Sequence, residues 1–426
     1  MIKILEYGKT PSEELFLRTD LSSQVGETVS EIIKNVRENG DKALYEYCLR
    51  FDGAKLDSLV VTKDEIDEAF ARADKELVRV LERAARNIRE FHEKQKRNGF
   101  IIARENGTVS GQRVIPLDSA GLYVPGGTAA YPSTVLMDAL PAKIAGVGRL
   151  CVTTPPDKNG KVGDAILIAA RIAGVDTIYK TGGAQAIAAL AYGTETIKKV
   201  DKIVGPGNAF VAEAKRRVSG VVGIDMIAGP SEILVVSDGK SSPRVIAADM
   251  LSQAEHDKNA TAVLLTDDRA FAEKVSEELE KQIPLLPRRE IARASIDNNG
   301  KIIVAPTLDL AIDLANELAP EHLELCVDEP FAYLGKLRHA GSVFMGRSCP
   351  EALGDYLSGA NHTLPTGGTA KFSSPLSVDD FVKKMQYTYY TSDSLGEVYK
   401  DIALFARTEG LEAHARSAEV RFEEEQ

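Results

Sequence analysis

Between residues 120 and 371 the sequence alternates short apolar runs with longer segments, and glycine-rich turns separate many of them. A short continuous apolar run between turns is typical of a strand buried on both faces, whereas the longer segments have the length of helices. Strands and helices in regular alternation form parallel sheets with right-handed crossovers. The sequence therefore predicts an α/β protein built on parallel sheets.

This alternation falls into two groups. The first group is predicted to contain the strands Leu150–Thr154, Thr177–Lys180, Lys202–Val204 and Ile233–Val236, with the helices Gly163–Ala173, Ala184–Tyr192 and Ala209–Val218. The second group is predicted to contain the strands Ala262–Leu265, Ile302–Val304, Leu323–Val327 and Ser342–Phe344, with the helices Phe271–Lys281 and Asp309–Leu318. We therefore expect two α/β units, residues 120–237 and residues 238–371.

The first hundred residues are predicted to be helical. Four apolar residues share one face of a helix: Val29, Ile32, Ile33 and Val36. Gly40 is placed to stop that helix, and Thr62 with Glu65 has the spacing of a capping box at the start of another. We expect residues 1–119 to form an N-terminal helical region that packs on the second α/β unit.

The chain changes character again after about Phe372. It is predicted to end in a charged helix, Asp401–Glu424, whose few apolar residues need a surface to pack on. We expect residues 372–426 to form a C-terminal tail. Such a tail either serves as a dimerisation arm or docks on its own chain.

Composition and charge exclude several classes of protein. The chain has 52 basic and 63 acidic residues, and a net charge of −11 without a basic block argues against a nucleic-acid partner. No apolar stretch approaches the roughly 20 residues that a membrane span needs. The four cysteines are dispersed and form no Cys-x-x-Cys pair, which predicts a reduced, cytoplasmic protein without structural disulfides.

Four glycine-rich turns follow or abut predicted strands. They are Tyr123-Val-Pro-Gly-Gly127, Thr181-Gly-Gly-Ala-Gln185, Val204-Gly-Pro-Gly-Asn208 and Ala228-Gly-Pro-Ser231. Any one of them could be a plain tight turn, but four within about a hundred residues favour a ligand cleft at the carboxyl ends of parallel strands. The dinucleotide fingerprint is incomplete, because Phe210 stands where its third glycine would be.

Three segments carry reactive side chains. Gln253 and His256 are three residues apart on a predicted helix, so that they share a face and could both bind a metal. Glu321 and His322 lie side by side just before a predicted strand, a pairing that suits general-base chemistry. The predicted loop Gly354–Thr366 carries a further carboxylate and a further histidine. Alternatively, these side chains are ordinary polar residues on the protein surface or part of a polar turn before a strand.

The ordered set of motifs resembles the histidinol dehydrogenase family. It comprises Gly121–Gly127, Gly182–Thr194, Val204–Asn208, Ala228–Glu232, Ser252–His256, Ala319–Leu323, Gly354–Thr366 and Glu409–His414. The resemblance implies NAD-dependent oxidation of L-histidinol through an aldehyde to L-histidine. It also implies two Rossmann-like domains with an incomplete fingerprint and a homodimer with shared active sites.

The same resemblance implies one zinc ion per subunit, bound by Gln253, His256, Asp355 and the partner subunit's His414. The zinc would orient the substrate, and these four ligands would also contact it. Glu321 would activate the water that adds to the aldehyde, and His322 would accept the alcohol proton.

The remaining matched positions would bind the two reactants. Ser231, His362 and Glu409, together with His322, match substrate-binding positions of the family. Tyr123, Gln185 and Asn208 match positions that contact NAD.

Two other interpretations compete with this one. A zinc hydrolase could use Glu321 with a metal-bound water and would need no NAD. A non-catalytic α/β binding protein is the third possibility, although the retained Glu321–His322 pair and the four candidate ligands speak against it.

Overall fold

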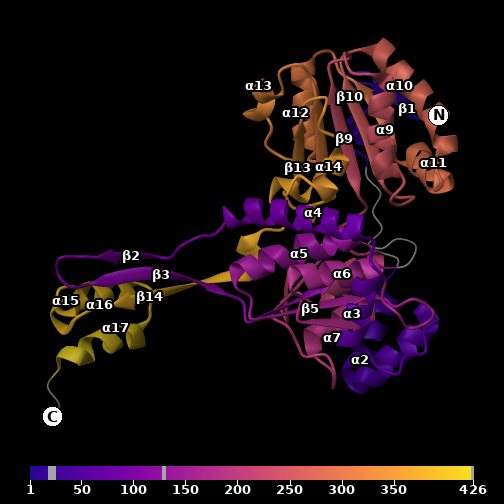
Figure 1. Cartoon of the computed structure of the whole chain (residues 1–426). Helices are drawn as coiled ribbons and strands as arrows, with labels where there is room; N and C mark the ends of the chain where they lie inside the picture. Colours follow the sequence, from indigo (N-terminus) through magenta and orange to yellow (C-terminus); the bar gives the residue numbers. More distant parts are fainter. Residues whose placement is uncertain (18–24, 127–130, 424–426) are drawn as a thin grey trace. The chain divides into compact units, whose positions relative to one another are not determined.

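The structure is a computed structural model that describes residues 1–17, 25–126 and 131–423 (Figure 1). Gly127, which ends the first predicted turn, and Glu424, which ends the predicted tail helix, lie outside the described residues. The described residues divide into two compact units. The larger one comprises Met1–Lys96 and Leu117–Phe381, and the smaller one comprises Arg97–Pro116 and the chain from Val382 onward.

The first sheet of the larger unit has five parallel strands in the order β6-β5-β4-β7-β8. These strands are β4 (Ser119–Tyr123), β5 (Arg149–Thr154), β6 (Thr177–Lys180), β7 (Lys202–Val204) and β8 (Gly223–Ile224). Between and beside them run α5 (Pro132–Ala145), α6 (Asp164–Ala173), α7 (Gly183–Tyr192) and α8 (Ala209–Val218). The strand order reverses at β4, which gives this sheet the switch point of a doubly wound fold.

The second sheet has six parallel strands in the order β1-β11-β10-β9-β12-β13. They are β1 (Lys3–Glu6), β9 (Glu232–Ser237), β10 (Thr261–Thr266), β11 (Lys301–Val304), β12 (His322–Cys326) and β13 (Ser342–Met345). Its helices are α9 (Pro243–Ala254), α10 (Arg269–Gln282), α11 (Arg289–Asn298), α12 (Leu308–Leu318), α13 (Pro330–Leu334) and α14 (Glu351–Tyr356). The prediction of two parallel α/β sheets is therefore confirmed.

The boundary that we predicted at residue 237 is wrong as a division between the sheets, because β9 lies in the middle of the second sheet. Ile233 and Val235 belong to one apolar core, whereas Leu234 and Val236 belong to the core on the opposite face. Successive side chains of a strand point to opposite faces, so that a strand buried on both faces needs this unbroken apolar run.

The three long N-terminal helices cover the first sheet rather than the second, whereas Leu15 of the short helix α1 (Ser12–Leu15) packs in a core of the second sheet. Helix α2 (Gly26–Tyr47) contacts α7 and α8, α3 (Lys63–Arg72) contacts α6, and α4 (Lys75–Glu93) contacts α5 and α6. The apolar face of α2 predicted around Val29 shares its core with the alanine-rich helix α7. Among these N-terminal elements, β1 joins the second sheet, where it pairs with β11. The prediction that the region packs on the second unit is therefore wrong for α2, α3 and α4.

Two local predictions in this region meet different outcomes. Gly40 interrupts α2 with a φ of 52° instead of ending it, and a π-helical turn, Cys48–Asp52, follows Tyr47. The capping box at the start of α3 is confirmed. The Thr62 hydroxyl accepts the Glu65 N–H (3.2 Å), and the Glu65 carboxylate accepts the Thr62 N–H (2.9 Å).

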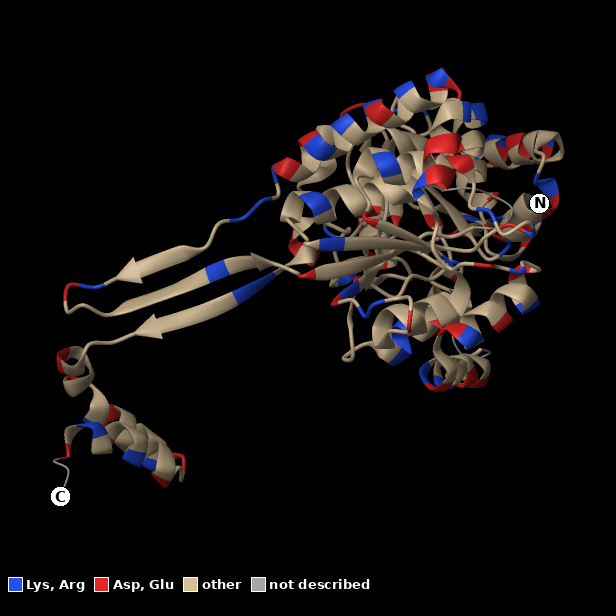
Figure 2. Ribbon diagram, turned by 60° about the horizontal axis from the view of Figure 1, so that its bottom comes forward, with Lys and Arg blue, Asp and Glu red and all other residues tan. Residues whose placement is uncertain are grey.

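The smaller unit contains an antiparallel sheet that we did not predict. Its strands are β2 (Phe100–Ala103), β3 (Val109–Pro116) and β14 (Val382–Tyr389), and few charged residues lie along them (Figure 2). The helices α15 (Ser392–Gly396), α16 (Tyr399–Thr408) and α17 (Glu412–Glu419) follow β14. The predicted tail helix is thus two helices, separated at Glu409–Leu411, where Gly410 has a φ of 79°. No helix of the described residues is long and apolar enough to cross a membrane.

We predict that Glu65→Gln destabilises the larger unit by about 1–3 kcal/mol at pH 7, because it removes charge-assisted hydrogen bonds. The Glu65 carboxylate binds Lys180 (2.9 Å) and Lys161 (3.0 Å) as well as capping α3. Burial alone would raise the pKa of Glu65, but the hydrogen bonds from Lys180, Thr62 and Lys161 lower it to about 2.

The pH dependence gives the sign of this effect. A carboxyl group whose pKa is lowered by folding stabilises the fold fully above its ordinary pKa of 4.5 and loses this contribution as the pH falls toward 2. The difference in thermal unfolding midpoint between wild type and variant should therefore narrow below about pH 4.5. Glu68→Gln is the control, because its pair with Arg72 on the same helix is exposed. Equal midpoints at pH 7 for wild type and Glu65→Gln would contradict the prediction.

Candidate active site

Two reactive side chains lie at the amino end of β12 in the second sheet. Glu321 directly precedes this strand, and His322 is its first residue. The Glu321 carboxylate accepts the backbone N–H of Glu232 (2.8 Å), and His322 Nδ1 is 3.0 Å from the carbonyl oxygen of the same residue. Because a carbonyl oxygen only accepts, Nδ1 carries the proton of the neutral imidazole. The lone pair of His322 is therefore on Nε2.

Burial sets the charge of both side chains. It lowers the pKa of His322 to about 4, so that the imidazole is neutral near pH 7. It raises the pKa of Glu321 well above the ordinary value, against the opposing effect of the Glu232 N–H. A neutral imidazole has a free lone pair that can accept a proton during a reaction, and a carboxyl group of raised pKa is a stronger base once it is ionised.

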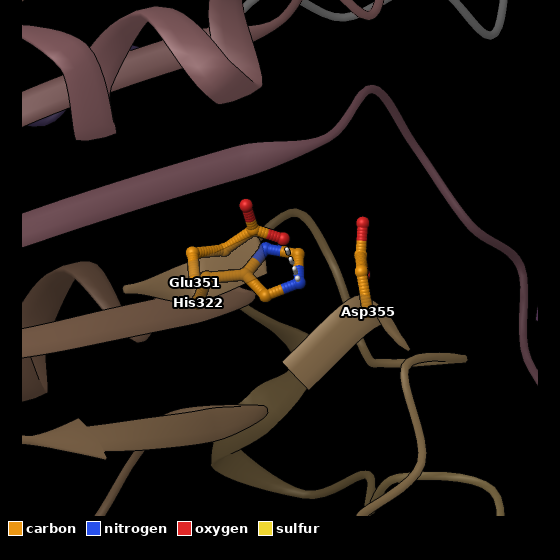
Figure 3. Close-up of side chains that lie close together, drawn as sticks. All are labelled: His322, Glu351 and Asp355. Atoms are coloured by element: carbon orange, nitrogen blue, oxygen red, sulfur yellow. Dashed lines mark ion pairs between the residues drawn. The ribbon is translucent and has the colours of Figure 1, made fainter. Parts of the chain in front are cut away.

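Two carboxylates of α14 face His322 (Figure 3). His322 Nε2 is 3.7 Å from Glu351 Oε1, and one ligand atom from each of His322, Glu351 and Asp355 lies within 4.8 Å of the others. Glu351 Oε1 is buried and has no hydrogen-bond partner among the described residues. The lone pairs of these three side chains are therefore close together, as they are in a site that binds a cation.

The two carboxylates differ in charge. Burial, together with the negative charge of Asp355, raises the pKa of Glu351 to about 8. Burial would also raise the pKa of Asp355, but its hydrogen bond with His362 and the charge of that residue lower it to about 2. His362 Nδ1 is 3.4 Å from Asp355 Oδ1, and its Nε2 is 3.2 Å from the Thr134 hydroxyl. Asp355 is therefore ionised at neutral pH.

Three of the four predicted metal ligands come from this part of the second sheet. Gln253 is buried near the end of α9, and its Oε1 has no hydrogen-bond partner among the described residues. The adjacent Ser252 hydroxyl binds Glu351 (3.2 Å), which brings the end of α9 against α14. His256 follows α9 and is close enough to Asp355 and His322 for its charge to affect the pKa of each. It is not one of the three residues whose ligand atoms lie within 4.8 Å.

The other predicted substrate and metal residues are more scattered. Ser231 directly precedes β9 and is half-buried, and its carbonyl oxygen accepts the Thr261 N–H (2.9 Å). Glu409 and His414 belong to the smaller unit, where both side chains are exposed.

Sequence analysis missed Glu351. Its spacing of four residues from Asp355 would have placed both carboxylates on one helical face, but we interpreted Gly354–Thr366, which contains Asp355, as a loop.

The three predicted NAD contacts lie at the carboxyl edge of the first sheet. Tyr123 ends β4, and its hydroxyl accepts the N–H of Gly183 at the start of α7 (3.1 Å). Gln185 is buried in the first turn of α7. Asn208 caps α8 by accepting the N–H groups of Phe210 (3.1 Å) and Val211 (3.2 Å).

The fold and the site together define a two-sheet α/β enzyme whose reactive groups are a buried histidine and several carboxylates. A family model described as histidinol dehydrogenase matches residues 17–422. The chain is 57% identical over 395 residues to the histidinol dehydrogenase of Geobacillus kaustophilus, with 93% of each chain covered. It is 52% identical over 427 residues to that of Clostridium acetobutylicum, with 99% of each covered.

A solved structure agrees with these relatives. The crystal structure of histidinol dehydrogenase from Elizabethkingia anophelis aligns with a TM-score of 0.93 at 38% identity, over 99% of this chain and 98% of that chain. The chain therefore belongs to the histidinol dehydrogenase family, which is a family of oxidoreductases. Membership of this family argues against the hydrolase interpretation of Glu321.

Proposed function

We propose that this chain oxidises L-histidinol through L-histidinaldehyde to L-histidine, the last step of histidine biosynthesis, and that it passes two hydrides to two NAD molecules. The observation that carries the proposal is the state of His322 in a chain of this family. The imidazole is neutral, and its Nε2 lone pair points into the volume bounded by Glu351 and Asp355. A base in this state accepts the alcohol proton as the hydride leaves the same carbon.

We assign Glu321 to the second half of the reaction. The aldehyde must gain water before a second hydride can leave, and this addition needs a base beside the reacting carbon. Glu321 adjoins His322 in the chain, with 3.7 Å between Glu321 Oε2 and His322 Nδ1. Its raised pKa makes the ionised carboxylate a stronger base than an exposed glutamate.

We propose that Gln253, His256, Asp355 and the partner subunit's His414 hold one zinc ion per subunit. The donor set fits zinc, which accepts imidazole nitrogen and carboxylate oxygen, although glutamine is an uncommon ligand. Two observations support the fit: the buried Gln253 Oε1 lacks a partner among the described residues, and Asp355 is ionised. When bound, zinc would hold the substrate's imidazole and amino group and so orient the alcohol. Glu351 would lie next to this site.

The remaining site residues are proposed to bind the reactants. We assign Ser231, His362 and Glu409 to the substrate, together with His322 and the four metal ligands. Tyr123, Gln185 and Asn208 are assigned to NAD, since they lie where a parallel sheet binds its ligand. We place the enzyme in the cytoplasm, because all four cysteines are free thiols.

The composition of the smaller unit supports the proposed homodimer. Among its described residues, the apolar cluster of buried side chains consists of Ala403, Ala406 and Ala415, which is too small a core for a unit of this size. Large apolar side chains are exposed instead: Phe100 is 53% exposed, Ile101 69%, Leu404 69% and Phe405 70%. We propose that a second copy covers these side chains and receives Glu409 and His414 in its active site.

The first test is NADH formation from histidinol and NAD, followed by absorbance. We expect about two NADH per histidinol, because a four-electron oxidation needs two hydride transfers. Activity should disappear after chelation and return with zinc, and elemental analysis should find one zinc per chain. Folded, zinc-supplied protein that forms no NADH would overturn the proposal.

Glu321→Gln should separate the two half-reactions. The amide still accepts the Glu232 N–H but is not a base, so that oxidation of the added aldehyde should fall by a factor of about 10²–10⁴. Alcohol oxidation should be affected far less. His322→Asn is the matched comparison and should impair alcohol oxidation. Equal losses of both half-reactions in Glu321→Gln would contradict the assigned role.

A complementation experiment tests the shared site. His256→Ala and His414→Ala homodimers should each lose zinc and activity. Mixed dimers contain one site that lacks both ligands and one site that lacks neither, so that part of the activity should return after subunit exchange. Failure to recover activity, with exchange verified by differently tagged subunits, would show that His414 serves its own chain.

A further inference from the structure

The carboxyl edge of the first sheet carries buried hydroxyl groups without partners. Thr154 ends β5, and Thr181 directly follows β6. Both residues are fully buried, and neither hydroxyl oxygen has a hydrogen-bond partner among the described residues. The two strands are paired with Thr154 opposite Lys180, so that both hydroxyls belong to one stretch of this edge. Buried polar atoms are normally paired, and unpaired ones require an explanation.

Asp52 brings a third such atom from outside the sheet. It ends the π-helical turn Cys48–Asp52, and its Oδ2 is buried without a hydrogen-bond partner among the described residues. The Cys48 thiol lies beside Asp52 and Thr181 but donates its single hydrogen to the Lys180 carbonyl oxygen (3.3 Å). Burial raises the pKa of Asp52 to about 6, and the neighbouring Cys48 thiol opposes this rise.

The charge of Asp52 also acts on Tyr123, one of the residues assigned to the dinucleotide. Tyr123 binds the first N–H of α7 through its hydroxyl (3.1 Å). Burial raises the pKa of Tyr123 to about 12, and the charge of Asp52 contributes to that rise. Asp52 as a whole is half-buried, so that part of the residue is exposed to solvent.

The acidic residue that follows the second strand of this sheet already makes other hydrogen bonds. In such sheets an acidic residue after the second strand binds the ribose 2′-hydroxyl of NAD. Here β5 is the second strand, and the next acidic residue is Asp157. Its Oδ1 accepts the N–H groups of Asn159 (2.8 Å) and Lys161 (2.9 Å) within a turn. Recognition of the ribose therefore needs an acceptor from another segment.

We propose that Asp52 binds the adenosine ribose hydroxyls of NAD and that its negative charge excludes the 2′-phosphate of NADP. This inference rests on the proposed function, which makes NAD the cofactor. A carboxylate has only acceptor oxygens, and a vicinal diol supplies two donors to them. A 2′-phosphate removes one donor and places a negative charge against another. The hydroxyls of Thr154 and Thr181 complete a polar edge around the ribose.

Steady-state kinetics of Asp52→Asn tests this role. The KM for NAD should rise about tenfold or more, the effect of losing a charge-assisted hydrogen bond, whereas kcat and the zinc content should change little. The preference for NAD over NADP in kcat/KM should fall by a similar factor. Asp57→Asn is the control, because this exposed residue lies in the same segment. An unchanged KM for NAD together with an unchanged cofactor preference would overturn the proposal.

A second measurement uses the intact enzyme and so does not depend on how the variant folds. Wild type should lose about tenfold in kcat/KM with an NAD analogue that lacks the adenosine 2′-hydroxyl. Asp52→Asn should use the analogue and NAD almost equally. Equal use of both by the wild type would overturn the assignment of Asp52 and leave the proposed function intact. Wild type that forms no NADH from histidinol would instead overturn the proposed function itself.

Discussion

The reactive pair of this enzyme depends on the backbone of one residue, Glu232. Its N–H binds the Glu321 carboxylate and its carbonyl oxygen binds His322, so that one peptide segment sets both the direction of the acid and the tautomer of the imidazole. Glu232 begins β9, which is buried along its whole length between β10 and β12. His322 lies opposite Ile233 in the ladder, so that strand pairing fixes the backbone that carries the imidazole. The central strand of the second sheet thus orients the two groups for which we propose a role on the substrate.

Three buried carboxyl groups, those of Glu324, Glu351 and Asp355, lie near this pair, and their mutual repulsion limits which of them can be charged. Glu324 accepts the Glu351 N–H at the start of α14 (2.6 Å). Burial, with the neighbouring charge of Asp249, raises the pKa of Glu324 to about 9, so that it is protonated near pH 7. Asp355 remains ionised because of His362. The ionised Asp355 and the unpaired, buried Oε1 of Gln253 favour a cation, which is the physical basis for the proposed zinc.

The strands that we predicted for the two parallel sheets agree with the structure to within one or two residues, because a continuous apolar run between turns has few other interpretations. Strands β1, β4 and β8 were not predicted. The sheet to which each strand belongs, and the helices that cover each sheet, could not be predicted. An apolar stripe such as that of α2 does not say which sheet it covers, and β9 is as apolar as any strand of the first sheet. The antiparallel strand β2 was not predicted, because all four of its residues are exposed. Its sequence therefore lacks the alternation of apolar and polar residues that indicates a half-buried strand. Glu321 and His322 could be predicted because the two reactive side chains are adjacent in the sequence. Glu232 contributes its backbone N–H and carbonyl oxygen, which every residue type has, so that its role could not be predicted.

The incomplete fingerprint also affects how a dinucleotide can be held. In a Rossmann loop the N-terminus of the helix binds the pyrophosphate through its unpaired N–H groups. In this chain the turn that partly matches the fingerprint precedes α8, and there the Asn208 side chain already occupies two N–H groups, those of Phe210 and Val211. A smaller part of the binding energy is then available from the phosphates, and more must come from side chains at the edge of the first sheet. In that arrangement an acceptor for the ribose, the role proposed for Asp52, contributes a large share of the affinity. Substitutions at this edge should accordingly change cofactor preference more than they change the fold.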